Sequence, residues 1–166
     1  ELARTLGVTP GDTAPPTAVR DAVLGLRRAK GMVLDDADPD TRSVGSFFTN
    51  PILSAEQLAA ADRAIRDRLG PEASYPRYPV PDEPAQAGRV KLSAAWLIER
   101  AGFTKGHPGP GGRVSISGKH TMALVNRGGT TADLLALAAQ IRDGVDAAFG
   151  VRLEPEPMLI GVQLPG

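Results

Sequence analysis

Hydrophobic residues recur every three or four positions in several stretches of this 166-residue chain, the spacing that places them on one face of a helix. Ser54 and Gln57 match a capping box, and Thr17 and Ser93 are further candidate N-caps. The pattern predicts a short helical turn in the first ten residues and helices over 17–30, 54–69, 93–101 and 131–149. The second of these helices should bury one face formed by Leu58, Ala61, Ile65 and Leu69.

Other stretches alternate between hydrophobic and polar residues, as half-buried strands do. Residues 113–126 predict two strands of a hairpin, and "GMVLDD", residues 31–36, predicts a short strand. Two extended segments are expected after Gly150, over 151–157 and 158–164. Because helices and strands are mixed and the later strands are neighbours in sequence, we expect an α+β fold, with helices packed on a small mixed or antiparallel sheet.

Residues 71–88, "PEASYPRYPVPDEPAQAG", follow neither period and hold five prolines and two tyrosines. Structureless loops of this length inside a compact domain are usually functional or disordered. Prolines restrict the backbone to extended conformations. The segment is therefore expected to be a long, stiff loop.

The composition excludes several classes of protein. Nineteen basic and nineteen acidic residues cancel, so no overall field attracts nucleic acid or an anionic membrane. No apolar run reaches the roughly 18 to 20 residues of a membrane span. The absence of cysteine excludes disulfides and thiolate metal sites, and with only His107 and His120 we expect no histidine metal site. The chain begins with Glu1 and shows no signal-peptide pattern, so we expect it to be part of a longer protein.

The stretch "SVGSFFTNPIL", residues 43–53, places two phenylalanines among turn-forming residues. A buried strand explains the phenylalanines, but it does not explain why Ser46, Asn50 and Pro51 surround them. Two interpretations remain open from the residues alone. The stretch is either a turn that holds a core aromatic pair, or a rigid platform that orients Ser46 and Asn50.

Three further motifs contain residue types that are used in binding or catalysis. "GGRVSISGKHT" has the wrong spacing for a phosphate-binding loop, and "GPGGR" lacks the third glycine of a dinucleotide fingerprint. "LEPEP" cannot be helical because of its prolines. Glu154 and Glu156 lie two apart on an extended backbone, so they should point to the same side of it, either as catalytic carboxylates or as the polar end of an edge strand.

Four segments, "GSFFTNP", "YPVPD…VKLSAAWLIERAGF", "KHTMALVNRGG" and "LEPEPMLIG", occur in a fixed order along the chain. Together they resemble the C-terminal part of the bacterial UDP-N-acetylenolpyruvoylglucosamine reductases, the MurB flavoenzymes. The resemblance runs from "LRRAKGMVLD" to "LIGVQL", which is nearly the whole chain. Two positions depart from the family pattern: Thr49 stands where a lysine is common and Met158 where an arginine is frequent.

The resemblance implies a cytoplasmic bacterial oxidoreductase of peptidoglycan and cell-wall synthesis. In this family FAD, reduced by NADPH, passes hydride to an enolpyruvyl ether on UDP-N-acetylglucosamine, which gives UDP-N-acetylmuramate. The flavin-binding half is missing here, so we expect this chain to bind no cofactor and to be inactive alone. The implied organisation is a helical segment over 1–30 that joins the flavin domain, a substrate-binding domain over 31–154, and a strand over 155–166 that returns toward the flavin domain.

The resemblance also implies roles for individual residues. Ser46 would deliver the proton to the enolic intermediate, and Glu156 would stabilise or protonate it. The family pattern implies five substrate-binding residues: Lys30, Asn50, Tyr78, Lys105 and His120. For three of these a structural role is the alternative, as a helix-end cation (Lys30), a turn residue (Asn50) and a hairpin-end histidine (His120). Tyr75 is the alternative to Tyr78 as the tyrosine that closes on the diphosphate.

Two other function classes remain possible from the sequence. The chain could be a stand-alone module that binds UDP-sugars or similar anions without redox activity. It could also be an α+β domain whose loops serve protein contacts.

Overall fold

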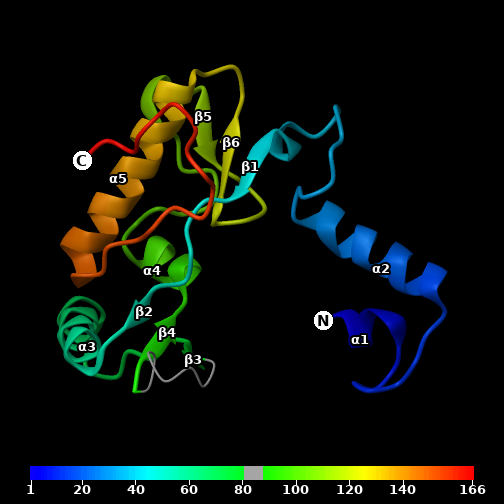
Figure 1. Ribbon diagram of the computed structural model, residues 1–166, viewed down its shortest axis with the longest axis horizontal. Coiled ribbons are helices and arrows are strands. Elements are labelled where there is room, and N and C mark those ends of the chain that lie inside the picture. The colour runs from blue at the N-terminus through cyan, green and yellow to red at the C-terminus, as the bar shows by residue number, and fades with distance from the viewer. Residues whose placement is uncertain (81–87) are drawn as a thin grey trace.

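The computed structural model describes residues 1–80 and 88–166, and Figure 1 shows its elements. The helices are α1 (Leu2–Leu6), α2 (Pro16–Ala29), α3 (Ala55–Leu69), α4 (Ala94–Arg100) and α5 (Thr131–Phe149), with 3₁₀ turns η1 (Pro39–Thr41) and η3 (Pro110–Gly112). The strands are β1 (Ser43–Ser46), β2 (Ile52–Leu53), β3 (Arg77–Pro79), β4 (Val90–Leu92), β5 (Val114–Ile116) and β6 (Ala123–Asn126). In the described part of the chain, every helix is too short or too polar to cross a bilayer.

The strands form two separate sheets, both antiparallel. One has the order β1-β6-β5 and the other β2-β4-β3. The predicted α+β class is confirmed, and the predicted hairpin over 113–126 is the β5–β6 pair. The single small sheet of the prediction is replaced by two three-stranded sheets.

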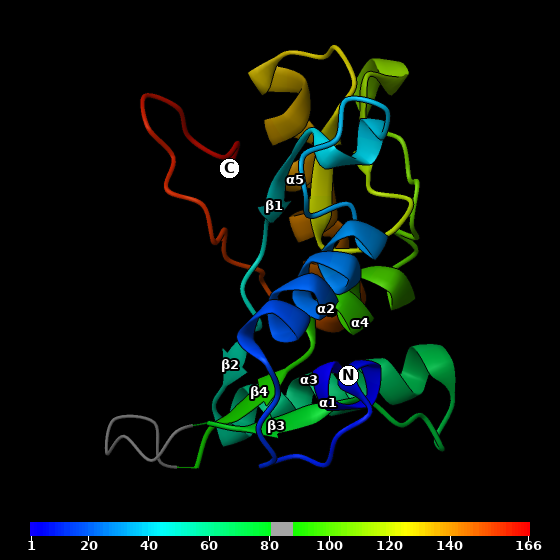
Figure 2. The same cartoon turned by 90° about the vertical axis from the view of Figure 1, so that its right-hand side faces the viewer.

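Helix α5 forms the centre of the core. It contacts β5, β6, α3 and α4, and its buried face includes Leu137, Ile141, Val145 and Phe149. Trp96 of α4 lies with its ring centroid 6.2 Å from that of Phe149. The α1–α2 pair lies to one side of this body in Figure 1 and in front of it in Figure 2.

The helix ends follow the expected capping chemistry at most positions. Ser54 accepts a hydrogen bond from the Gln57 N–H, and Gln57 accepts one from the Ser54 N–H, so the predicted capping box is confirmed. Ser93 caps α4 as predicted, by accepting from the Trp96 N–H at 3.2 Å. For α5 the cap is Thr130, one residue before the predicted start.

The Thr17 cap is a wrong prediction. Helix α2 begins at Pro16 and its N-cap is Pro15, so Thr17 lies inside the first turn. Proline is favoured at the first helical position because its missing N–H needs no partner there.

Two predictions based on hydrophobic pattern are also wrong. Residues 31–36 form turns and bends, because Gly31 leaves α2 in the left-handed conformation (φ 68°), and Leu34 is 79% exposed. Leu69 is 38% exposed, because it lies in the last turn of α3, beyond the buried part of the helix face.

The long loop over 71–88 and the C-terminal strand over 155–166 differ from the prediction in detail. The expected loop over 71–88 contains strand β3, while residues 81–87 lie outside the described residues. In the predicted strand over 155–166, Pro155 forms an isolated antiparallel bridge with Phe48, and the chain described after it is irregular.

Candidate functional site

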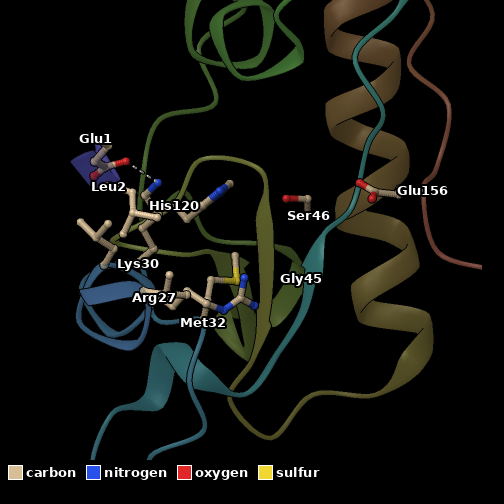
Figure 3. Close-up of a pocket in the computed structure, with 11 residues that line it drawn as sticks. Glu1, Leu2, Arg27, Lys30, Met32, Gly45, Ser46, His120 and Glu156 are labelled. Atoms are coloured by element: carbon tan, nitrogen blue, oxygen red, sulfur yellow. Dashed lines mark hydrogen bonds and ion pairs between the residues drawn. The ribbon is translucent and has the colours of Figure 1, made fainter. Parts of the chain in front are cut away.

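A cavity of about 550 Å³ lies between the α1–α2 pair and the end of β1. Four of the predicted site residues line it: Lys30, Ser46, His120 and Glu156. Figure 3 shows the Ser46 side chain between His120 and Glu156, with Lys30 and Arg27 on the side toward the N-terminal helices. The fold therefore brings together residues that come from four distant parts of the chain.

Backbone hydrogen bonds of Phe47, the residue after Ser46, connect this bend to the segment that carries Glu156. The Phe47 N–H donates to the Met122 carbonyl at 2.8 Å, and the Phe47 carbonyl accepts from the Glu156 N–H at 2.8 Å. The residue after Ser46 is thus held on both sides. Because these bonds use main-chain groups, they position both side chains without occupying either of them.

The turn around Ser46 contains a bulge. Gly45 has φ 74°, and the pairing of β1 with β6 changes register between Ser43 and Ser46. A bulge of this kind redirects the side chain that follows it, and a left-handed residue there is best supplied by glycine. The sequence "GS" therefore orients Ser46 into the cavity instead of along the sheet.

Phe47 and Phe48 are both fully buried, and their rings meet edge to face with centroids 5.0 Å apart. Phe48 also forms the bridge with Pro155. The two interpretations of this stretch are therefore compatible. The aromatic pair belongs to the core, and it anchors the bend that carries Ser46.

His120 is held as a neutral hydrogen-bond donor. Burial, with Lys30 and Lys105 nearby, lowers its pKa. Its Nδ1 accepts from the Met122 N–H at 3.1 Å, which requires that nitrogen to be unprotonated. In the neutral ring the proton is then on Nε2, and the ring points toward Ser46 (Figure 3).

Cations lie along one wall of the cavity. Lys30 pairs with the Glu1 carboxylate at 3.4 Å, and both side chains are about half exposed. Arg27 lines the same wall. The sequence prediction missed Arg27, although its position three residues before Lys30 places the two on one helix face.

The two carboxylates of "LEPEP" line different cavities. Glu156 faces the Ser46 cavity, whereas Glu154 lines a second cavity of about 410 Å³. Both residues pair their backbone with the same neighbouring segment, on either side of the Phe48–Pro155 bridge, so the prediction that they share one side of the extended chain stays a prediction. Glu154 lies opposite Thr49, and the Thr49 N–H donates to the Glu154 carbonyl at 3.0 Å. Glu156 lies opposite Phe47.

Three predicted binding residues, Asn50, Tyr78 and Lys105, are not among those that line the Ser46 cavity in the described part of the chain. Asn50 faces the second cavity, and its side-chain oxygen accepts from the Ala94 N–H at 2.9 Å. Tyr78 is 45% exposed on β3. Lys105 is exposed in the loop after α4.

Tyr75, the alternative to Tyr78, is buried against Trp96. Its hydroxyl donates to Asp62 at 2.7 Å and accepts from Arg77 at 2.6 Å. Burial, together with the hydrogen bond to Asp62, raises the Tyr75 pKa. The ring and the hydroxyl of Tyr75 are therefore both engaged in contacts within the fold.

The comparisons with known proteins identify the family. The family model for the UDP-N-acetylenolpyruvoylglucosamine reductase C-terminal domain matches residues 38–160. The chain belongs to this family. The matched residues include Ser46, His120 and Glu156, while Lys30 precedes them.

Curated relatives agree with this identification. The chain is 63% identical over 166 residues to the UDP-N-acetylenolpyruvoylglucosamine reductase of Thermobifida fusca and 60% identical over 165 residues to that of Saccharopolyspora erythraea. In both cases the alignment covers 99% of this chain and 44% of the relative. The chain therefore spans less than half the length of the reductases it matches.

Two glycines in the loops before β5 and before α5 pack closely on β5. A Cβ at Gly109 would approach Val114 Cγ2 to 2.5 Å, and one at Gly129 would approach Val114 Cγ1 to 2.8 Å. These glycines allow the loops to pack on β5. Among residues 1–80 and 88–166, no group of three or more His, Asp or Glu side chains could hold a metal ion.

The two departures from the family pattern also have structural consequences. The Thr49 N–H and hydroxyl both donate to the Glu154 carbonyl, at 3.0 and 3.4 Å. Thr49 thus strengthens the pairing that carries Glu156. Met158 is 86% exposed, so its side chain makes little contact with the described core.

Proposed function

We propose that this chain is the substrate-binding domain of an enzyme that reduces UDP-N-acetylenolpyruvoylglucosamine to UDP-N-acetylmuramate, a peptidoglycan precursor. The observation that carries this proposal is the cavity shared by Ser46 and Glu156. FAD, reduced by NADPH and held by the part of the protein outside this chain, supplies the hydride. The residues of this chain bind the substrate and deliver the proton. We place the reaction in the bacterial cytoplasm, where the precursor and NADPH are made.

Ser46 is the proton donor in this proposal. Hydride addition at the terminal carbon of the enolpyruvyl group spreads negative charge into the neighbouring carboxylate as an enolate. An alcohol is a weak acid, so it must be held close to the basic carbon on one face. The hydrogen bonds on both sides of Phe47 and the buried aromatic pair supply that rigidity.

Glu156 stabilises the enolate or completes its protonation. It lines the same cavity as Ser46, and Figure 3 shows it on the side of Ser46 opposite His120. Fixed polar groups directed at a developing charge lower a barrier because they need no reorganisation during the reaction. Glu154, which lines the other cavity, has no part in the reaction.

Lys30 and His120 bind the anionic substrate. The Lys30 ammonium contributes a charge, and His120 contributes one neutral N–H, both from the wall opposite Glu156. A substrate carboxylate or diphosphate can replace Glu1 as the partner of Lys30, because that ion pair is exposed and weak.

Tyr78, Lys105 and Asn50 contact the UDP part from outside the cavity. Tyr78 is favoured over Tyr75 because its hydroxyl is at an exposed site, while the Tyr75 hydroxyl already has two partners. Lys105 adds a cation for the diphosphate. The side-chain NH₂ of Asn50 is the group available for a contact, since its oxygen accepts from Ala94.

The alternative, a stand-alone UDP-sugar module without redox activity, is not favoured, because the relatives on which the family assignment rests are named as reductases. The test is a turnover assay of the full-length protein that contains this chain, with NADPH and the enolpyruvyl substrate. We expect NADPH oxidation that depends on the substrate. NADPH oxidation at the same rate with and without substrate would contradict the proposal.

A further inference from the structure

Asp40 is a buried carboxylate at the centre of three segments. It is 6% exposed and accepts hydrogen bonds from Ser117 Oγ at 2.8 Å, the Gly118 N–H at 2.7 Å and Arg127 Nη2 at 2.6 Å. Burial alone would raise the pKa of Asp40, but the hydrogen bonds from Ser117, Arg127 and Gly118 outweigh it and hold the pKa below its usual value. The carboxyl group is therefore ionised at neutral pH and can only accept.

The ionised carboxylate fixes the direction of the Ser117 hydroxyl. Since Asp40 carries no proton, Ser117 must donate to it, and the lone pairs of its oxygen point the other way. They accept from the Lys119 N–H at 3.0 Å and from the His120 N–H at 3.2 Å. Ser117 is fully buried, so water does not replace these bonds.

The turn held by Ser117 determines where His120 lies. The His120 carbonyl accepts from the Ala123 N–H at 3.0 Å, and its Nδ1 accepts from the Met122 N–H. Both the backbone and the ring are thus bonded within one tight turn. A change in the position of the His120 backbone would move the ring and its Nε2.

Asp40 also packs against the turn that follows Lys30. A Cβ at Gly31 would lie 3.4 Å from both the Cβ and the carbonyl oxygen of Asp40. Gly31 is in the left-handed conformation and directly follows Lys30. Asp40 therefore lies between the turns that carry two cavity residues, Lys30 and His120, although it does not line the cavity itself.

We propose that Asp40 is a positioning residue for substrate binding, which acts through Ser117 to hold the His120 Nε2–H where it donates to an oxygen of the bound substrate. This inference rests on the proposed function. It assigns to a residue outside the cavity the task of keeping a neutral donor in place beside Ser46.

A matched control lies two residues away. Asp38 pairs with Lys119 at 2.5 Å and so links the same two segments, but both side chains are partly exposed. Partly exposed ion pairs contribute little to stability. Asp38→Asn removes the charge of this pair. The asparagine Oδ1 can still accept from the Asp40 N–H, as Asp38 does at 3.1 Å, so Asp40, Ser117 and His120 keep their hydrogen bonds.

The experiment compares wild type, Asp40→Asn, Ser117→Ala and Asp38→Asn in the full-length protein. Nitrogen NMR of labelled histidine, without substrate, reports which ring nitrogen of His120 is protonated. Wild type and Asp38→Asn are expected to show one tautomer, with Nε2 protonated. Asp40→Asn and Ser117→Ala are expected to show a mixture, together with a KM for the enolpyruvyl substrate raised roughly tenfold, the effect of one lost hydrogen bond. Flavin reduction by NADPH should be unchanged.

Ser117→Ala keeps the proposal testable if Asp40→Asn does not fold, because the Arg127 and Gly118 bonds to Asp40 remain. If the folded variants lower only the melting temperature, and their His120 tautomer and KM match those of Asp38→Asn, Asp40 is a structural residue and the proposal is wrong. A wild-type protein that does not turn over the substrate would contradict the proposed function instead. In that case the NMR comparison would still decide the role of Asp40.

Discussion

The N–H of Glu156 donates to the carbonyl of Phe47 at 2.8 Å, and this bond places Glu156 next to Ser46. The bond joins the bend that follows strand β1 to the proline-flanked segment near the end of the chain. Because the bond is made by the backbone, substitution of either side chain should leave the geometry of the other intact. The roles of Ser46 and Glu156 can therefore be tested one at a time.

Ser46→Ala in the full-length protein should separate the two half-reactions. Flavin reduction by NADPH should stay at the wild-type rate, because Ser46 takes no part in it. Reoxidation by the enolpyruvyl substrate should fall roughly 10²- to 10⁴-fold, the usual contribution of a positioned proton donor. Stopped-flow absorbance of the flavin measures both steps.

Ser43→Ala is the control for this prediction, since Ser43 lies on the same strand but outside the cavity. Reoxidation at the wild-type rate in Ser46→Ala would show that another group provides the proton.

Glu156→Gln should lower kcat by about 10²- to 10³-fold, in the range of losing one group that stabilises a transition state. The amide keeps the size of the side chain and the backbone bond to Phe47. Glu154→Gln, in the same motif but facing the other cavity, should have nearly wild-type kcat. Equal losses in the two variants would contradict the assignment of Glu156.

Phe48→Ala should destabilise the chain by about 3 to 5 kcal/mol, because a fully buried aromatic ring leaves a cavity when it is removed. Val44→Ala on the neighbouring strand should cost much less, since Val44 is exposed. Urea unfolding followed by tryptophan fluorescence compares the two, with Trp96 as the single reporter. A loss for Phe48→Ala no larger than that for Val44→Ala would show that the aromatic pair does not anchor the bend.

Acid should weaken the fold through Asp40. Its pKa in the folded chain is below the usual 3.8, so its contribution to stability is fully present above that value and is lost as the pH falls through the lower, folded pKa. Asp40→Asn should therefore be less stable than wild type at neutral pH, and the difference should shrink below about pH 4. Thermal unfolding across pH 2 to 7 measures this.

Asp21→Asn is the control here, because Asp21 is an exposed carboxylate paired with the adjacent Arg20. If the difference between wild type and Asp40→Asn does not vary with pH, the charge of Asp40 is not what stabilises the three segments.

After mixing with FAD and gel filtration, the chain by itself should show no flavin absorbance. The full-length protein should purify with bound flavin. This expectation follows from the proposed function, in which the flavin is held by the part of the protein outside this chain. Absorbance after gel filtration tests both proteins. A yellow chain would show that part of the flavin site lies in these residues.

Local features of the chain were predictable from sequence. The capping box at Ser54, the cap at Ser93, the β5–β6 hairpin and the buried face of α5 depend on residues a few positions apart. Patterns that depended on burial were less reliable, because exposure is decided by what else packs nearby. Leu34 and Leu69 are hydrophobic but exposed, and the 31–36 strand found no neighbour to pair with among the described residues.

The sequence by itself determined the family, the types of residue available for chemistry, and the bend in which glycine, two phenylalanines and proline hold Ser46. Only the tertiary structure decided that Glu156 lines the same cavity as Ser46 while Glu154 lines another, that the His120 Nδ1 accepts from the Met122 N–H, and that Asp40 bonds to the segment just before His120. The reason is physical. Capping and periodicity are set by neighbours along the chain, whereas the direction of a side chain and its protonation depend on groups that folding brings from distant positions.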